Sequence, residues 1–416
     1  MKKKLIYILI LSPILGLIHS CNYLDVVPDN VATIDHAFAT RDQAEKFLFT
    51  CYSYIPNMAH PNNNVGLMGA DELWTSYQIH GYESWNIARV EQNVNDPFLN
   101  YWEGRRGGTN LYNAIRDCNI FLENIVDTNK APELNETMRN RWISEVTFLK
   151  AFYHFYLFRM YGPIVIVDKN LPISSTPEKV KAKRMPVDSV VNYIARLYDQ
   201  SMENLPESIT EIQSELGRIT RPGVLAIKAR LLVTAASPLF NGYEPYRNFK
   251  DKDGIRLFSD YDFDKWERAV QACDSALRSC SENGIGLYDK LSDYDLRVGD
   301  NEVLKRQLVI RNSFARDGET GWSSDIIWGL SGRHGNDQLQ TLAMARLDPA
   351  NSQNVAASRE ELNPPIEITN LFYTKEWGTY RRRQGFRFRN FNRSNGCCEN
   401  RSRQRQQTPI SAYRRL

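Results

Sequence analysis

The sequence predicts a mainly α-helical protein, in which paired helices form a stack and long loops make up one large irregular face. Three observations predict this fold class. Apolar residues recur every three or four positions in six segments, residues that cap or stop helices flank these segments, and stretches rich in Gly, Asn and Pro separate some of them. Hydrophobic residues occupy 42% of the 416 positions, so the chain can build a core without disulfide or metal crosslinks.

The first two predicted helices lie on either side of a long irregular segment. Residues 39–55 offer Thr40 as an N-cap and repeat apolar residues at helical spacing. The residues on this apolar face are Ala44, Phe47, Leu48, Cys51 and Tyr54. Residues 56–95 are rich in Gly, Asn and Pro and are predicted to be irregular. The helical period returns between Leu111 and Ile125.

The clearest helical pattern in the chain covers residues 138–161, where apolar side chains recur at spacings of three and four. Gly162 and Pro163 end this helix. Two further helices are predicted for residues 186–205 and 224–236. The second is rich in Ala, and small side chains allow neighbouring helices to approach closely.

A sixth helix is predicted from Asp264, because Glu267 follows it at the spacing of a capping box. Its expected inward face consists of Trp266, Ala269, Val270, Cys273 and Ala276. The Trp and Ala spacing resembles the first helix of a tetratricopeptide unit, although a Trp on such a face is also common in ordinary cores. No clean period of about 34 residues is visible. The prediction is therefore a degenerate tetratricopeptide-like helical repeat stack.

The first 21 residues predict export and a lipid anchor. Three Lys residues precede an unbroken apolar run over residues 5–18, which is shorter than the roughly 20 residues that cross a bilayer. The run ends in Leu17, Ile18, His19 and Ser20 before Cys21, and this order resembles the lipobox of bacterial lipoproteins. Residues 1–20 are then the signal peptide, and Cys21 carries the lipid. The alternative is an ordinary thiol behind a soluble-secretion leader.

Charge is unevenly distributed along the chain. The formal net charge is +3, but without the three leader lysines the basic and acidic residues balance. Residues 22–375 contain 38 basic and 47 acidic residues, whereas residues 376–416 contain 11 Arg and two Glu. An acidic body argues against binding of duplex nucleic acid.

The sequence predicts neither a metal site nor a cofactor. Cys273 and Cys280 lie two turns apart on one predicted helix, about 10 Å, which is too far for a disulfide, so buried thiols are expected. No Cys or His pair has the spacing of zinc ligands, and no phosphate-binding or hydrolase motif occurs.

Several stretches, in this order, carry a resemblance to a known family. They are Cys21-Asn22-Tyr23-Leu24-Asp25, Tyr112-Asn113-Ala114-Ile115, Glu145 to Tyr153 running on to Arg159-Met160-Tyr161-Gly162, Gly217-Arg218-Ile219-Thr220, and Ala235 to Gly242. With these motifs the chain resembles the SusD/RagB family of Bacteroidetes outer-membrane nutrient-binding lipoproteins.

The resemblance implies a domain organisation and a function. Residues 22–215 would be a SusD-like N-terminal region and residues 216–375 a partial SusD/RagB C-terminal region, with four tetratricopeptide-like units. The protein would be a lipid-anchored, surface-exposed lipoprotein of the cell outer membrane. It would capture glycans or other nutrients for a SusC-like TonB-dependent transporter, without catalysis and without nucleic acid.

Two loop regions combine aromatic and polar residues in the way that sugar binding requires, because aromatic rings cover apolar sugar faces and polar groups hold hydroxyls. The first region contains Asp71, Glu72, Trp74, Tyr77, Tyr82, Trp85 and Asn86. The second contains Trp322, Ser323, Asp325 and Trp328. Local packing is the alternative for any single Trp, since Trp is mostly buried on average. Trp142 and Trp266 are assigned to the core.

Two other function classes remain open. An exported glycan-degrading enzyme would use paired carboxylates, and Asp71 with Glu72 is the nearest pair, although adjacent carboxylates usually diverge and serve as caps or solvated groups. Turnover of a glycan or peptide would identify such an enzyme. A purely structural surface protein would neither bind a ligand nor associate with a transporter.

The Arg-rich end of the chain has a composition unlike the rest. Arg and Phe alternate in residues 381–405, a pattern typical of single-strand nucleic-acid binding, which conflicts with export. Permitted codons read one base later from Lys375 give an acidic peptide with Asn-Gly followed by Pro, and the single codon of Trp377 forces the Gly. An extra A beside the Lys375 codon would be enough to cause this change of reading frame. We therefore expect residues 376–416 to be a frameshifted, non-native tail without stable packed structure.

Overall fold

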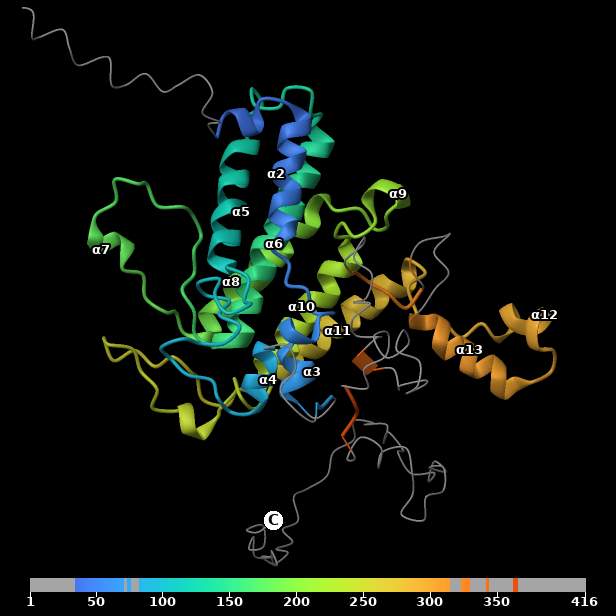
Figure 1. Cartoon of the computed structure of the whole chain (residues 1–416). Coiled ribbons are helices and arrows are strands. Elements are labelled where there is room, and N and C mark those ends of the chain that lie inside the picture. Colours follow the sequence, from blue (N-terminus) through green and yellow to red (C-terminus); the bar gives the residue numbers. More distant parts are fainter. Residues whose placement is uncertain are drawn as a thin grey trace, which may run out of the picture. The chain divides into compact units, whose positions relative to one another are not determined.

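The fold is mainly α-helical, as predicted (Figure 1). The computed structural model describes residues 34–70, 73–75, 82–314, 322, 324–329, 342–343 and 362–365. Within these ranges there are three isolated β-bridges and no longer strand. The α-helices are α2 (Arg41–Ser53), α3 (Val65–Gly69), α4 (Glu83–Ala88), α5 (Leu111–Ile125), α6 (Glu136–Tyr161), α7 (Pro177–Val180), α8 (Val187–Ser201), α9 (Ile212–Glu215), α10 (Arg221–Ala236), α11 (Asp264–Glu282), α12 (Asp295–Val298) and α13 (Glu302–Phe314). The 3₁₀-helices are η1 (His36–Phe38), η2 (Pro61–Asn63), η3 (Met202–Asn204), η4 (Glu244–Tyr246) and η5 (Leu291–Tyr294).

Each long helix packs against the next long helix along the chain. Helix α2 contacts α5 and α6, α5 contacts α6, α6 contacts α8, α8 contacts α10, and α10 contacts α11. The blue and green ribbons of α2, α5 and α6 run side by side in Figure 1. Packing between neighbours in sequence is the arrangement of helical repeats, and the predicted degenerate tetratricopeptide-like stack is confirmed.

Side-chain caps fix where the first long helices begin. The Thr40 hydroxyl accepts a hydrogen bond from the backbone N–H of Gln43 at 3.3 Å, as the sequence predicted for α2. Asn110 and Asn135 cap α5 and α6 in the same way, through the N–H groups three residues later. These bonds satisfy donors that the first turn of a helix otherwise leaves open.

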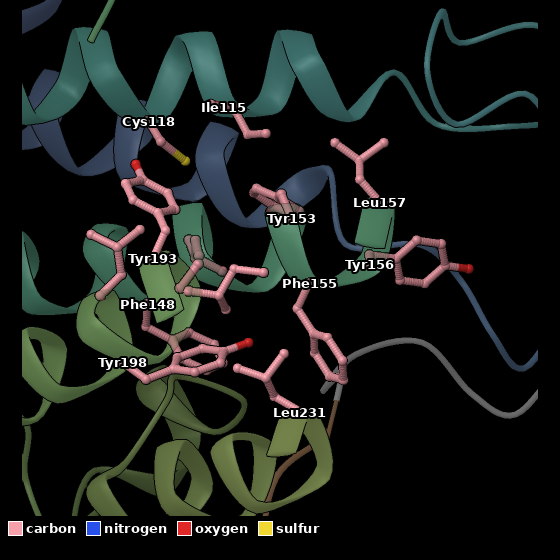
Figure 2. Close-up of a cluster of buried hydrophobic side chains, with 14 of the residues drawn as sticks. Ile115, Cys118, Phe148, Tyr153, Phe155, Tyr156, Leu157, Tyr193, Tyr198 and Leu231 are labelled. Carbon is pink, nitrogen blue, oxygen red and sulfur yellow. The ribbon is translucent and has the colours of Figure 1, made fainter. Parts of the chain in front are cut away.

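Helix α6 lies at the centre of the hydrophobic core and is buried on almost every side. Figure 2 shows Phe148, Tyr153 and Leu157 of α6 among side chains of α5 and α8. The surrounding labelled residues are Ile115 and Cys118 from α5, Tyr193 and Tyr198 from α8, and Leu231 from α10. Trp142 of α6 is 1% exposed, so its assignment to the core is confirmed. Trp266 is partly buried and packs against the same core.

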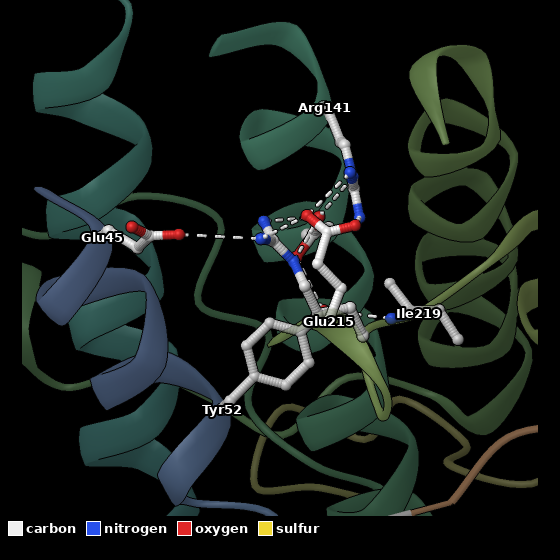
Figure 3. A network of polar contacts seen from close by, with 7 residues as sticks. Glu45, Tyr52, Arg141, Glu215 and Ile219 are labelled. Carbon is white, nitrogen blue, oxygen red and sulfur yellow. Dashed lines mark hydrogen bonds and ion pairs between the residues drawn. The ribbon is translucent and has the colours of Figure 1, made fainter. Parts of the chain in front are cut away.

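A buried polar network ties α2 and α6 to the segment before α10 (Figure 3). The carboxylate of Glu145 is fully buried and accepts hydrogen bonds from Tyr52 Oη at 2.9 Å and Arg141 Nε at 3.0 Å. Arg218 donates its Nε to the same carboxylate at 3.0 Å and its Nη1 to Glu215 at 3.2 Å. The charges of α6 and of the segment before α10 thus compensate each other, and Tyr52 of α2 adds a hydrogen bond.

Burial and the neighbouring charges act in opposite directions on this network. Burial raises the pKa of Glu145, whereas Arg218, Arg141 and the Tyr52 hydroxyl favour the ionised carboxylate. Burial lowers the pKa of Arg218, but Glu145, Tyr52 and Glu215 together have the larger effect, so this pKa lies above its ordinary value. Each group therefore depends on its partner for a stable place in the core.

The start of α11 differs from the prediction. Asp264 is the first residue of the helix, and the N-cap is Phe263, which makes no side-chain capping bond. Asp262 instead accepts a hydrogen bond from the backbone N–H of Asp264 at 3.0 Å. Ala269 and Ala276 are buried as expected, but Val270 is 57% exposed, because the buried face of α11 is narrower than the five predicted positions.

Residues 56–95 contain more regular structure than their composition predicts. Helices η2, α3 and α4 lie within this segment. Local side-chain bonds start two of them: His60 Nδ1 accepts from the N–H of Asn62, and Asn64 Oδ1 accepts from the N–H of Leu67. Short helices of this kind depend on caps and tertiary contacts, which residue composition does not reveal.

Several sequence predictions concern residues outside the described ranges. These are the signal peptide, the lipid on Cys21 and the non-native tail from residue 376. The regional boundary at residue 215 stays a prediction, while the described core extends across it to Ile219 and Val224. Of the described helices, none has both the length and the apolar character that a bilayer crossing requires.

Candidate functional site

An open pocket with aromatic walls lies between the segment after α2, helices α6 and α10, and residues 328–329. Its volume is about 350 Å³, within the range of small-ligand sites. The described residues that line it are Ile55, Pro56, Asn57, Met58, Ala59, Phe152, Phe155, Tyr156, Arg159, Ile227, Arg230, Trp328 and Gly329. None of them is acidic. We call this site the α6–α10 pocket.

The floor of the α6–α10 pocket is formed by successive turns of α6. Phe155 and Tyr156 are 2% and 3% exposed, so only the edges of their rings reach the cavity. Both are labelled in Figure 2, where Phe155 lies towards Leu231 of α10 and away from Ile115 and Cys118 of α5. Phe152 is half-buried and offers more of its ring. Helical spacing puts Phe152, Phe155 and Arg159 on one face of α6.

Trp328 forms one wall of the pocket and is held in a fixed orientation. Its indole Nε1 donates to the carbonyl of Gly217 at 2.9 Å. Its ring meets Phe148 and Phe152 edge to face, with centroids 5.2 and 5.5 Å apart. Gly223 of α10 packs beside it: a Cβ there would be in ordinary contact with the Trp328 Cβ, at 3.4 Å, and would approach Ile219 Cδ1 to 2.7 Å. A rigid, half-buried indole of this kind is suited to cover an apolar ligand face.

Two arginines stand at the pocket without an acidic partner. The Arg159 guanidinium lies over the rings of Phe155 and Tyr156, 5.8 and 6.0 Å from their centroids. Arg230 comes from α10 and is exposed. Burial lowers the pKa of Arg159, and the like charge of Arg230 lowers it further. The pocket therefore combines apolar rings with a concentrated positive charge.

Residues of the second predicted loop region have different surroundings: some lie at this pocket and others make local contacts. Trp328 lines the pocket, and the ring of Trp322 is next to it, since a Cβ on Gly329 would lie 3.8 Å from that ring. Asp325 does not face the pocket: its carboxylate accepts a hydrogen bond from the backbone N–H of Tyr288. Ser323 lies outside the described residues.

The first predicted loop region is mostly packed inward where the structure describes it. Tyr82, Trp85 and Asn86 are 6%, 7% and 8% exposed and belong to α4 or its N-cap, not to an open loop. Tyr82 and Trp85 pack with Met68, Leu342 and Leu362 in a small hydrophobic cluster. These three residues therefore stabilise the segment by packing. Of the predicted residues described in this region, Trp74 is the one with a side chain exposed enough to contact a ligand.

Trp74 remains a candidate binding surface. It is 45% exposed, and its backbone pairs with Asn363 through two hydrogen bonds of 2.8 and 3.0 Å. This short antiparallel bridge fixes the backbone and leaves the indole at the surface. Asp71, Glu72 and Tyr77, which complete the predicted region, lie outside the described residues.

Sequence reasoning missed the α6 and α10 side of the pocket. Aromatic residues within helices were assigned to the core, and most of those on α6 are buried. Because α6 is buried on almost every side, polar residues included, its sequence does not show which row of rings faces a cavity. The one available signal was Arg159, a charged residue in the last turn among Phe and Tyr.

Two other cavities have a different character. One of about 260 Å³ lies by α8, α10 and α11, and one of about 300 Å³ lies by α5, α6 and α8. Their described lining is mostly polar and charged, with a few aliphatic residues and no aromatic ring. Within the described ranges, no group of three or more His, Cys, Asp or Glu residues is placed to hold a metal ion.

Comparison with known proteins agrees with this helical architecture. A sequence profile of a SusD-like family, described as starch-binding and associating with the outer membrane, matches residues 22–233. The chain belongs to this family. A SusD-like protein of Bacteroides ovatus is 22% identical over 275 residues, which are 65% of this chain and 45% of that protein.

Solved structures show the same fold. A protein named BT4246 superposes with a TM-score of 0.65 at 27% sequence identity, over 80% of this chain and 57% of its own. A selenomethionine form of that protein gives a TM-score of 0.60 at 28% identity, over 81% and 57%. The chain thus spans about half the length of the relatives that it matches.

Proposed function

We propose that this protein captures glycans in the α6–α10 pocket. The observation that carries the proposal is an open pocket with the exposed parts of Trp328 and Phe152 on its walls, in a member of a family described as starch-binding. Aromatic rings cover the apolar faces of sugars, and the polar groups at Asn57 and the two arginines can hold hydroxyls. Trp74 is proposed as a separate contact for a longer ligand.

Capture takes place without chemistry in this proposal. The glycan binds on a lipoprotein of the outer membrane, anchored through Cys21 and exposed at the cell surface, and then passes to a SusC-like TonB-dependent transporter. The family description of association with the outer membrane supports this location. The order of residues around Cys21 supports the anchor, since lipid chains hold an otherwise soluble protein at a membrane.

Calorimetry with the full chain and a broad panel of neutral and acidic oligosaccharides tests the binding site. Ala59 is exposed at the pocket, so Ala59→Trp should obstruct the cavity and lower affinity at least tenfold without changing the free energy of unfolding. Ala182→Trp, at an exposed position away from the pocket, is the matched control. Equal binding by both variants would place the ligand elsewhere, and release of shorter products would indicate an enzyme.

The anchor is tested separately by Cys21→Ala. The unchanged protein should sediment with membranes, and the variant should be released in soluble form, because the lipid has no other attachment point in the proposal. Cys273→Ala keeps Cys21 and serves as the control. Membrane association that survives Cys21→Ala would contradict the lipid anchor and leave the glycan site unaffected.

A further inference from the structure

The two arginines of the α6–α10 pocket differ in their contacts from the buried or partly buried arginines elsewhere in the protein. Arg139 donates four hydrogen bonds to backbone carbonyls, and Arg218 and Arg141 pair with carboxylates. Within the described part of the chain, Arg159 and Arg230 make no hydrogen bond or ion pair with their guanidinium groups. Arg159 stacks on two rings but pairs with no anionic group of the described residues, and Arg230 is exposed beside it, so both charges are available to a ligand.

The positions of the two guanidiniums allow them to act together. Arg159 comes from the last turn of α6 and Arg230 from the facing helix α10, and both line the same cavity. Each is close enough to Tyr156 to oppose the effect of burial, which raises the pKa of that phenol. The charge of Arg230 disfavours the charged form of Arg159, so an anion held between the two would relieve this repulsion.

The apolar part of the pocket limits what that anion can be. Phe152, Ile227, Met58 and Trp328 present carbon surface beside the guanidiniums, so a free inorganic anion would leave most of the cavity lining in contact with water. A ligand that matches both parts carries an anionic group on a ring with an apolar face. Planar guanidinium groups pair with carboxylate and sulfate oxygens through two parallel hydrogen bonds.

We propose that the α6–α10 pocket selects acidic glycans, with Arg159 and Arg230 binding the carboxylate of a uronic acid or the sulfate of a sulfated sugar while Trp328 and Phe152 cover the sugar ring. This inference rests on the proposed glycan capture and specifies its substrate class. It assigns the selectivity for charge to one residue on each of two facing helices.

The experiment compares matched charged and neutral ligands on the full chain by calorimetry. One arm uses an oligogalacturonate and its carboxyl-reduced form, and the other uses a sulfated galactan oligosaccharide and its desulfated form. At least one acidic ligand should bind tenfold or more tightly than its neutral counterpart. This advantage should shrink between 50 and 300 mM salt, because ions screen a partly exposed charge pair. The arm that shows it identifies the group as carboxylate or sulfate.

Variants of the two arginines test their assignment. Arg159→Gln and Arg230→Gln should each lower affinity for the acidic ligand about tenfold and change affinity for its neutral counterpart much less, and Arg230→Glu should abolish the acidic preference. Arg230 is exposed, so its variants should keep the wild-type melting temperature even if Arg159→Gln lowers it. Arg196→Gln is the matched control, since Arg196 also stacks on a ring, that of Tyr193, from the surface of another helix.

The outcomes separate the two proposals. Neutral glycans bound as tightly as acidic ones, or acidic glycans bound unchanged by both Arg230 variants, would overturn the charge selectivity and leave glycan capture standing. Binding of no oligosaccharide in the panel, charged or neutral, would overturn the proposed function and this inference with it.

Discussion

At the scale of single residues, the protein depends on a few buried polar groups whose partners lie far away in the sequence. Glu145 and Arg218 belong to two of the motifs that carry the family resemblance, and the structure gives these positions a structural role. The sequence marked them only as parts of motifs. Their pairing could not be predicted, because 73 positions separate the two residues and only the packed helices bring them together.

Removal of the buried carboxylate should be strongly destabilising. Glu145→Gln keeps the size of the side chain but leaves the Arg218 guanidinium, 6% exposed, without its main counter-charge. We expect the free energy of unfolding, measured by urea titration, to fall by about 3 kcal/mol, which is the cost of removing one charged partner of a buried ion pair. Glu267→Gln on the exposed face of α11 is the control and should change stability by less than about 0.5 kcal/mol. Similar losses for the two variants would contradict this role.

His154 should make stability depend on pH. Its Nδ1 lies 2.8 Å from the carbonyl of Lys150, its Nε2 accepts from the N–H of Val167, and burial lowers its pKa to about 4. The unfolded chain binds a proton near pH 6.5 and the folded protein only near pH 4. The contribution of His154 is therefore complete above pH 6.5, decreases as the pH falls through that value and levels off below about pH 4.

The measurement is the free energy of unfolding of wild type and His154→Gln between pH 7.5 and 4. Lys150 and Asp168, which also face the ring, are present in both proteins, so their titration largely cancels in the difference. We expect the wild-type advantage to shrink by about 3 kcal/mol over this range. Parallel pH profiles for the two proteins would show that His154 does not titrate differently on unfolding.

At the scale of elements, the helices with long apolar periods could be predicted and the short ones could not. The patterns of α2, α5, α6, α8 and α10 were recognisable because one face repeats over several turns. The binding site was harder to predict than the helices. Tyr82 and Trp85 are of the residue types that form sugar-binding surfaces, but they belong to the short helix α4 or its N-cap and are buried. Trp328, predicted to contact a ligand, lines the α6–α10 pocket, whereas its partners on α6 resembled core residues in the sequence. Which face of a buried helix borders a cavity is a tertiary property.

The end of α6 requires a glycine. Gly162 has φ of 69°, and its N–H donates to the carbonyl of Phe158 at 2.8 Å, which ends the helix and starts the segment towards α8. Gly162→Ala should lower the free energy of unfolding by about 1 to 2 kcal/mol, because a Cβ is strained in the left-handed region. Gly286→Ala is the control: its φ is not in that region, and nothing lies within 4 Å of the added Cβ. Equal stabilities in thermal and urea unfolding would refute this requirement.

At the scale of the whole molecule, the core centred on α6 is well buried, whereas the later helices α11 and α13 expose apolar side chains. Val270 and Leu277 of α11 are 57% and 68% exposed, and Val303 and Ile310 of α13 are 69% and 64% exposed. Single exposed apolar residues are ordinary, but rows of them along helices lower solubility. The sequence predicted α11 but neither α13 nor these rows, since exposure depends on what packs against a face.

The last prediction concerns the hypothesis of a frame change beside the Lys375 codon. If that hypothesis is correct, restoring the frame replaces an Arg-rich tail with an acidic segment that can pack. Burial of a few hundred square ångströms of apolar surface, at about 25 cal/mol per Å², would raise the free energy of unfolding by about 5 to 10 kcal/mol. Resequencing around this codon comes first, and urea unfolding of the 416-residue and frame-restored chains follows. A confirmed A-run, together with cooperative melting of the 416-residue chain and protease protection of residues 376–416, would show that the tail is native and has a function of its own.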